Sequence, residues 1–167
     1  GHTRWATHGK PSDENSHPQV SSSGKIAVVH NGIIENYLHL KEFLISKGVV
    51  FHSETDTEVV AQLIDYYYEG DLLSAVHKAI DRVEGSYALG IMSEDFPDKI
   101  VAVRRDSPLI VALCEKGSFL ASGSAPDFHD DVLVIIGILG QEEYPQFLPQ
   151  LFLSCLEIIY FLADQFP

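Results

Sequence analysis

The sequence predicts a layered α+β fold in which helices cover an antiparallel sheet. In the first half, a short apolar strand is followed by helices with recognisable start and stop signals. In the second half, the helical period gives way to short apolar runs separated by turns. The chain has 167 residues, of which 46% are hydrophobic, and this is enough to form one continuous core. Disorder of the whole chain is therefore excluded.

The first predicted strand is Ile-Ala-Val-Val at 26–29, which lies between a turn rich in Ser and Gly and the dipeptide Asn31-Gly32. We interpret this dipeptide as a sharp corner that leads from the strand into a helix. In that helix Asn36 is the expected cap, and apolar residues recur every three or four positions. Gly48 is the expected end of the helix.

The clearest helix start in the chain follows a short strand expected at 49–51. Thr55 is the expected cap, and Glu58 completes the pattern of a capping box. Apolar residues then occupy one face as far as Gly70, where the helix is expected to stop. Asp71 is the expected cap of a further helix. Two helices in succession are predicted to form one layer.

The second half of the chain is predicted to consist of strands linked as hairpins. The helix for which Asp71 is the expected cap should end at Gly85. Turns rich in Asp, Pro, Ser and Gly separate the apolar runs that follow. These runs lie at 87–92, 100–103, 109–113 and 119–121.

The charge balance argues against a nucleic acid partner. Eleven Lys and Arg face 24 Asp and Glu, which gives a formal net charge of −13. Such a chain repels a phosphate backbone unless its basic residues gather on one face, and the sequence shows no such gathering.

A cytoplasmic location is predicted from the cysteines and the N-terminus. Cys114 and Cys155 are too few for a secreted disulfide scaffold, and a reducing cytosol with both thiols buried is the simplest interpretation. The N-terminal residues do not follow the pattern of a signal peptide. Because the chain begins with Gly1 rather than Met, we expect it to be a piece of a longer protein.

The last part of the chain, 123–167, differs in composition from the rest and is interpreted as an acidic, apolar tail without an assigned role. It contains apolar runs at 132–139 and 151–163 but no Lys or Arg. The second run is shorter than the roughly 20 residues that span a bilayer, and no basic residues flank it. A buried helix is therefore expected there, and no membrane partner is predicted.

Polar clusters stand at the ends of predicted strands, where loops commonly carry binding sites. Together they offer a guanidinium, a carboxylate, a side-chain amide and a glycine N–H. This set suits an amino acid with a reactive carbonyl group. Arg4 can bind an α-carboxylate and Asp56 an α-ammonium, while Asn31 and the N–H of Gly32 can hold a developing oxyanion.

Six motifs in the chain also resemble a known family. They closely resemble the glutaminase domain of the isomerizing glutamine–fructose-6-phosphate aminotransferases, the glucosamine-6-phosphate synthases. The resemblance covers residues 1–122, and its first motif favours this family over other type-2 glutamine amidotransferases. The motifs are His-Thr-Arg-Trp-Ala-Thr-His-Gly at 2–9, Asn-Ser-His-Pro at 15–18, Val-His-Asn-Gly-Ile-Ile-Glu-Asn at 29–36, Ser-Glu-Thr-Asp-Thr-Glu at 53–58, Glu-Gly-Ser-Tyr-Ala at 84–88 and Ser-Pro-Leu at 107–109.

The resemblance implies an N-terminal-nucleophile hydrolase fold, an αββα sandwich that here lacks its first strands. It also implies hydrolysis of glutamine to glutamate and transfer of the ammonia to a sugar-phosphate isomerase domain of the same chain. The complete enzyme converts fructose 6-phosphate and glutamine into glucosamine 6-phosphate and glutamate. No metal or organic cofactor is implied.

The motifs also imply roles for individual residues. Asn31 and Gly32 would form the oxyanion hole. Arg4 would bind the α-carboxylate of glutamine, and Asp56 its α-ammonium. These two assignments agree with the chemistry expected from the residue types alone.

Four further residues receive roles only from the resemblance. Trp5, Thr7 and His8 would line the glutamine pocket, and Trp5 would help to seal the pocket and the ammonia path. His17 would lie in the loop that faces the sugar-binding partner domain. The eight histidines of the chain do not match a known ligand spacing, so no metal site is predicted.

Whether this chain is itself an enzyme stays open at this point. In the family the nucleophile is a cysteine at the mature N-terminus, whereas this chain begins at Gly1. Neither Cys114 nor Cys155 stands in a matching motif. The alternatives are a truncated, non-catalytic module that self-associates as a homo-oligomer through the tail, or another type-2 amidotransferase. The expected domain is a partial amidotransferase domain at 1–122.

Overall fold

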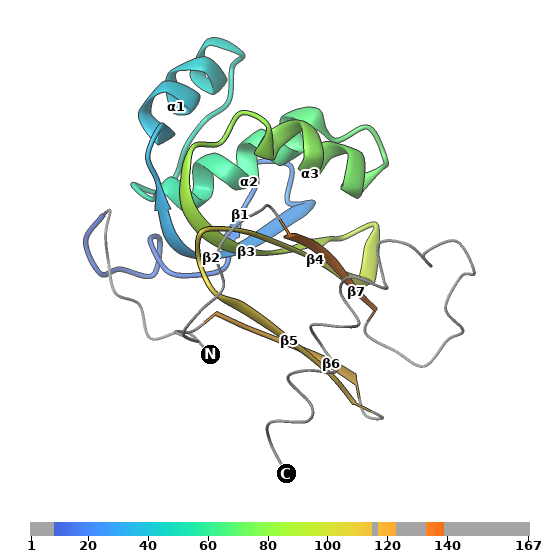
Figure 1. Cartoon of the computed structure of the whole chain (residues 1–167). Helices are drawn as coiled ribbons and strands as arrows, with labels where there is room; N and C mark the ends of the chain where they lie inside the picture. Colours follow the sequence, from blue (N-terminus) through green and yellow to red (C-terminus); the bar gives the residue numbers. More distant parts are fainter. Residues whose placement is uncertain (1–8, 115–116, 123–132, 139–167) are drawn as a thin grey trace.

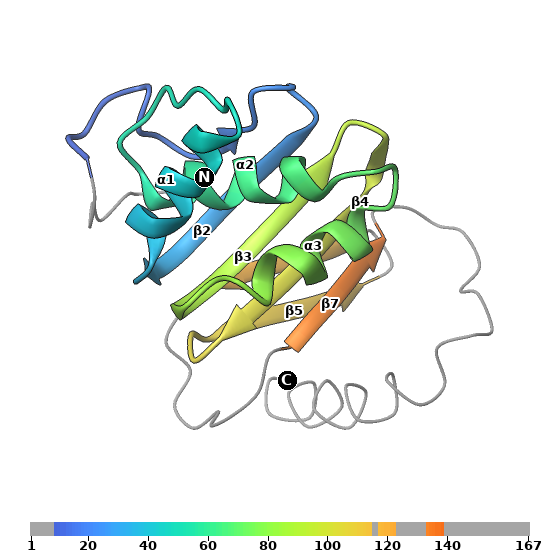
Figure 2. The same ribbon diagram turned by 90° about the horizontal axis from the view of Figure 1, so that it is seen from above.

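The computed structural model describes residues 9–114, 117–122 and 133–138, which form stacked layers (Figure 1). The main sheet has five strands in the order β1-β2-β3-β4-β7, and a second sheet pairs β5 with β6. Helices α1, α2 and α3 cover one face of the main sheet, and the second sheet lies on the other side (Figures 1 and 2). The described residues therefore form a helical layer and two sheets, which agrees with the αββα sandwich implied by the motifs. The elements are β1 Gln19–Val20, β2 Ile26–Ile34, α1 Tyr37–Ser46, α2 Asp56–Tyr67, α3 Leu72–Ile80, β3 Gly85–Ser93, β4 Phe96–Arg105, β5 Leu109–Cys114, β6 Gly117–Ser122 and β7 Leu133–Ile138.

Strand β2 is longer than predicted and continues through Asn31 and Gly32 to Ile34. The predicted corner is therefore wrong. Gly32 pairs with Tyr87 of β3, and its φ of +128° suits glycine. A Cβ at this position would lie 2.2 Å from the carbonyl oxygen of Ser86. Glycine thus serves a close approach of two backbones here instead of a turn.

Helix α1 begins where Asn36 predicts, but the Asn36 side chain makes no capping hydrogen bond. Its amide donates to the carbonyl oxygen of Arg82 at 2.8 Å and accepts from the backbone N–H of Glu84 at 3.0 Å. This side chain therefore ties the start of α1 to the segment that leads into β3.

Helix α1 ends at Ser46, and the predicted stop residue Gly48 stands in the turn that closes it, but no strand follows at 49–51. The N–H of Gly48 donates to the carbonyl of Ile45, and the N–H of Val49 donates to the carbonyl of Leu44. This is the Schellman pattern, which satisfies the last carbonyls of a helix. Because the N–H of Val49 closes the helix, it is not available to a sheet.

The predicted start of α2 is confirmed, with Thr55 as the cap. Its hydroxyl accepts from the N–H of Glu58 at 3.2 Å. The carboxylate of Glu58 accepts from the N–H groups of His52 and Ser53, just before the cap. The reciprocal bond of the capping box therefore goes to earlier residues, and it fixes the loop that enters the helix.

Helix α3 starts as predicted but ends earlier. Asp71 caps it by accepting from the N–H groups of Leu73 and Ser74. The helix ends at Ile80, not at Gly85. Gly85 instead opens β3, where a Cβ would lie 2.2 Å from the carbonyl oxygen of Ile33 of β2.

The predicted strands of the second half all form, each with one or more additional residues. Strands β3 and β4 form an antiparallel hairpin, as do β5 and β6. Strand β7, at Leu133–Ile138, pairs with β4 in an antiparallel manner, so a strand of the main sheet lies within the segment interpreted as a tail. The run at 151–163 lies outside the described residues.

The core lies between the helical layer and the main sheet. Apolar side chains of β2, β3 and β4 pack there against those of α2 and α3. Every residue of α2 from Asp56 to Ile64 is buried, including the polar ones. Helix α2 is therefore the central helix of the layer. The inward face of α3 is apolar, and all of its members are buried: Leu72, Val76, Ala79, Ile80 and, just beyond the helix, Val83.

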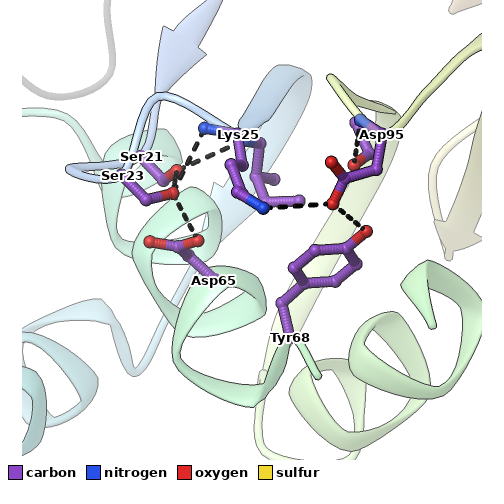
Figure 3. A network of polar contacts seen from close by, with 8 residues as sticks. Ser21, Ser23, Lys25, Asp65, Tyr68 and Asp95 are labelled. Atoms are coloured by element: carbon purple, nitrogen blue, oxygen red, sulfur yellow. Dashed lines mark hydrogen bonds and ion pairs between the residues drawn. The ribbon is translucent and has the colours of Figure 1, made fainter. Parts of the chain in front are cut away.

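A polar network joins three turns at the end of α2 remote from its cap (Figure 3). The carboxylate of Asp95, in the turn between β3 and β4, accepts from the hydroxyl of Tyr68 at 2.7 Å and from Nζ of Lys25 at 3.2 Å. These two donors hold the pKa of the Asp95 carboxyl below its usual value. The hydroxyl of Ser23 donates to Asp65 at 2.7 Å. These exposed contacts fix the turn between β1 and β2 against α2.

Candidate functional site

The start of α2 lies against β2, and Asp56 makes the principal contact. Its Oδ2 accepts from the backbone N–H of Ile34 at 3.1 Å, and its Oδ1 lies 3.8 Å from Nδ1 of His30. Only 4% of the Asp56 surface is exposed. A carboxylate in the first turn is favoured by the positive end of the helix dipole. The predicted ammonium-binding residue is thus held by a strand and a helix start together.

Thr57, the next residue, contacts two histidines. Its Oγ1 lies 3.2 Å from Nε2 of His17 and 3.1 Å from Nδ1 of His30. The backbone N–H of His30 donates to Nδ1 of His17 at 3.4 Å. The ring of His17, predicted to face a partner domain, is therefore hydrogen-bonded at the start of α2. Its predicted role at the partner domain stays a prediction.

Three of the six motifs converge on the loop before α2. The side chain of Asn15 accepts from the N–H of Glu54 at 2.9 Å and donates to the carbonyl of Lys10 at 2.9 Å. Gly9, the last residue of the first motif, lies so close that a Cβ would be 2.7 Å from Nδ2 of Asn15. Motifs far apart in the sequence therefore form one local structure.

Asn31 and Gly32 lie on β2 between His30 and Ile34, the two residues that contact the start of α2. The side chain of Asn31 is exposed, and its amide donates to the hydroxyl of Ser122, at the end of β6, at 3.2 Å. It points toward the second sheet, whereas the buried ring of His30 points toward the helices. Asn31, the predicted oxyanion donor, therefore extends from one face of β2. Asp56, the predicted ammonium ligand, lies against β2 on the side of the helices.

Four predicted site residues, Arg4, Trp5, Thr7 and His8, lie outside the described residues, and their roles stay predictions. The sequence reasoning gave no role to Thr57 or Ser122. Thr57 stands inside one of the six motifs, but its spacing gave no sign of a contact with His17, forty positions earlier. Ser122 is the last residue of the resemblance and likewise carries no pattern of its own.

Glu58 offers a test of the loop that holds the site. Its carboxylate is 1% exposed and accepts from two backbone N–H groups and from Nε2 of Gln62. We expect Glu58→Ala to lower the free energy of unfolding by about 2 to 3 kcal/mol, because buried donors lose their acceptor. Urea denaturation measures this loss. The control is Asp71→Ala, which removes an exposed helix cap and should cost about 1 kcal/mol. Equal losses would contradict the importance of the buried carboxylate.

The described part of the chain contains neither a metal-binding cluster nor a helix that could span a membrane. No group of three or more His, Cys, Asp or Glu residues there could hold a metal ion. No helix among the described residues has both the length and the apolar character needed to cross a membrane.

Comparison with known proteins identifies the family. A family model described as a glutamine amidotransferase domain matches residues 2–128. The chain is 66% identical over 122 residues to the isomerizing glutamine–fructose-6-phosphate aminotransferases of Clostridium acetobutylicum and Clostridium tetani, covering 73% of this chain and 20% of each relative. It is 52% identical over 136 residues to the aminotransferase of the same name from Thermotoga maritima, covering 80% of this chain and 22% of that relative. The chain thus spans about one fifth of the length of these relatives.

Solved structures with the same fold include a glutamine phosphoribosylpyrophosphate amidotransferase from B. subtilis. It aligns with a TM-score of 0.59 and 26% identity, covering 71% of this chain and 26% of that chain. An allosteric regulatory enzyme of purine biosynthesis aligns with a TM-score of 0.55 and the same identity, covering 65% of this chain and 24% of that chain. These likenesses agree with the N-terminal-nucleophile hydrolase fold implied by the motifs. The chain belongs to the glutamine amidotransferase domain family and is homologous to the glutaminase part of the glucosamine-6-phosphate synthases.

Proposed function

We propose that this chain is the glutamine-binding part of an isomerizing glutamine–fructose-6-phosphate aminotransferase. The observation that carries the proposal is the buried carboxylate of Asp56, held by the N–H of Ile34, which stands on β2 two residues beyond Gly32. The 66% identity with aminotransferases of this name supports the same substrate. The identity with the phosphoribosylpyrophosphate amidotransferase is 26%, so a different type-2 amidotransferase is less well supported.

In the proposed site, the two charged groups of glutamine each contact a side chain of opposite charge, and its side-chain carbonyl contacts hydrogen-bond donors. Asp56 binds the α-ammonium, and Arg4 binds the α-carboxylate through its planar guanidinium. The amide of Asn31 and the N–H of Gly32 stabilise the oxyanion that develops when the side-chain carbonyl is attacked. Their placement on a paired strand holds them in position before the reaction.

The remaining proposed roles concern the pocket wall and the partner domain. Trp5, Thr7 and His8 line the pocket, and Trp5 helps to seal the ammonia path. His17 faces the sugar-phosphate isomerase domain, where ammonia reacts with fructose 6-phosphate to give glucosamine 6-phosphate. The nucleophile is a cysteine at the mature N-terminus of the complete enzyme. The reaction needs no metal or organic cofactor, and the enzyme acts in the cytoplasm.

The proposal predicts that Asp56→Ala weakens glutamine binding by about 1.5 to 3 kcal/mol, the size of one charged hydrogen bond. Asp56→Asn keeps an oxygen for the N–H of Ile34 and removes only the charge, so it should give a similar loss without loss of stability. Calorimetric titration of the chain with glutamine measures the affinity. Asp71→Ala, at a cap away from the site, should leave this affinity unchanged.

A second ligand makes this test specific for the ammonium group. Glutaramate has the side-chain amide and a carboxylate but lacks the α-ammonium, so its affinity should be nearly the same for the unmodified chain and for Asp56→Asn. If Asp56→Ala lowered the melting temperature but left the glutamine affinity unchanged, Asp56 would be a helix-start residue only. The proposed role would then be wrong.

A further inference from the structure

The hydroxyl of Thr57 joins three segments at the proposed site. This hydroxyl contacts His17 in the second motif and His30 on β2. Thr57 itself lies in the first turn of α2. Thr57 is 1% exposed and directly follows Asp56. None of the roles assigned above uses this hydroxyl, although its two contacts bring both histidine rings to the start of the helix.

The hydrogen bonds restrict where the protons of these groups can lie. The backbone N–H of His30 donates to Nδ1 of His17, so that nitrogen carries no proton. An imidazole keeps at least one N–H, which for His17 is then at Nε2, and this group donates to Oγ1 of Thr57. Among the described residues, the other side-chain partner of this hydroxyl is Nδ1 of His30. The hydroxyl has one proton to donate, and in the simplest arrangement that fits these contacts Thr57 donates it to that nitrogen, which places the proton of His30 on Nε2.

This proton order affects Asp56. Nδ1 of His30 lies 3.8 Å from Oδ1 of Asp56, which is an ion-pair distance if the ring is charged but too long for a hydrogen bond. When the Thr57 hydroxyl donates to Nδ1, the His30 ring beside the Asp56 carboxylate is neutral. A neutral ring does not compete as a cation with the ammonium group of a ligand.

We infer that Thr57 is a positioning residue of the glutamine site: its hydroxyl holds His30 as the neutral ring protonated at Nε2, and so keeps the Asp56 carboxylate for the ammonium group of glutamine. This inference rests on the proposed role of Asp56. Thr57 acts through His30, and its hydroxyl, rather than its methyl group, is what the site requires.

The position of the proton can be measured without any ligand. Long-range ¹⁵N–¹H correlation spectra of the histidine-labelled chain distinguish a protonated from an unprotonated ring nitrogen. We expect His30 to be protonated at Nε2 in the unmodified chain and in Thr57→Ser, and to lose this preference in Thr57→Val. A proton on Nδ1 of His30 in the unmodified chain would overturn the inference.

Glutamine titration tests the consequence for binding. Thr57→Val should weaken the affinity about 10-fold, the equivalent of one hydrogen bond, and Thr57→Ser should stay within about 3-fold of the unmodified chain. Thr55→Val is the structural control: it removes the helix cap and should lower the melting temperature while His30 remains protonated at Nε2.

The outcomes separate the inference from the proposed function. If Thr57→Val bound glutamine as tightly as the unmodified chain, the inference would be wrong while the proposed function stood. If the unmodified chain did not bind glutamine, the proposed function would fail, and with it the role of Thr57 in binding. The spectra would still decide whether Thr57 sets the proton on His30.

Discussion

Replacing Gly32 by Ala is expected to lower the free energy of unfolding by about 4 kcal/mol or more, a large share of the stability of an ordinary domain. The added Cβ would lie 2.2 Å from the carbonyl oxygen of Ser86 and 2.8 Å from Cα of Tyr87. Both obstacles are backbone atoms, which no change of rotamer can move. The φ of +128° adds strain for any residue with a Cβ. Urea denaturation, or recovery of soluble protein if the loss is complete, measures the effect.

Gly48→Ala is the matched control for this prediction. Gly48 also has a positive φ, +88°, but a Cβ there would have nothing within 4 Å. Its replacement should therefore cost only the conformational strain, about 1 to 2 kcal/mol. If Gly32→Ala cost no more than Gly48→Ala, the close approach of β2 to β3 would carry no energetic weight and the prediction would be contradicted.

Asn31→Ala in the full-length enzyme that we propose should lower turnover roughly 100- to 1000-fold, which corresponds to about 2.7 to 4 kcal/mol. The side-chain amide interacts mainly with charge that develops during attack on the glutamine carbonyl. Glutamine binding should therefore change little. Steady-state kinetics of glutamate release, with kcat and KM determined separately, measure both effects.

Ser122 provides the control for Asn31. Its hydroxyl accepts a hydrogen bond from the Asn31 amide at 3.2 Å, so Ser122→Ala tests how much this neighbour contributes to the position of the amide. We expect a much smaller loss of turnover than in Asn31→Ala, because the amide itself remains. A variant Asn31→Ala that kept its maximal rate but bound glutamine poorly would assign Asn31 to substrate binding instead.

Local signals in the sequence predicted the helix starts well. Thr55 with Glu58, and Asp71, have their hydrogen-bond partners within a few residues, so the pattern contains nearly all the information needed. The strands at 87–92 and 100–103 were also recognisable, because hairpin partners are close in the sequence. The prediction of an α+β fold followed from these elements.

Interactions between distant segments explain the failures. Asn31-Gly32 and Gly85 match the local signals of a turn and of a helix end, yet both glycines serve the contact between β2 and β3. The expected strand at 49–51 did not form, because Val49 completes the end of α1. In each case the local pattern was consistent with two structures, and a partner remote in the sequence decided between them.

The candidate site shows the same division. The motifs predicted Asp56, and the structure holds it against β2. They gave no role to Thr57, because its contacts with His17 and His30 depend on how three segments fold together. Residue type and spacing therefore indicate the chemistry of a site, whereas the groups that orient it become visible only in three dimensions.

The two glycines at the contact between β2 and β3 also restrict how this sequence can change in evolution. A side chain introduced into a core can often be accommodated when a neighbouring side chain becomes smaller. Gly32 would meet the backbone of Ser86, and Gly85 would meet the backbone of Ile33, and no mutation removes a backbone carbonyl. Compensating substitutions are thus excluded at both positions. Each glycine must be retained independently for as long as the two strands pair in this register.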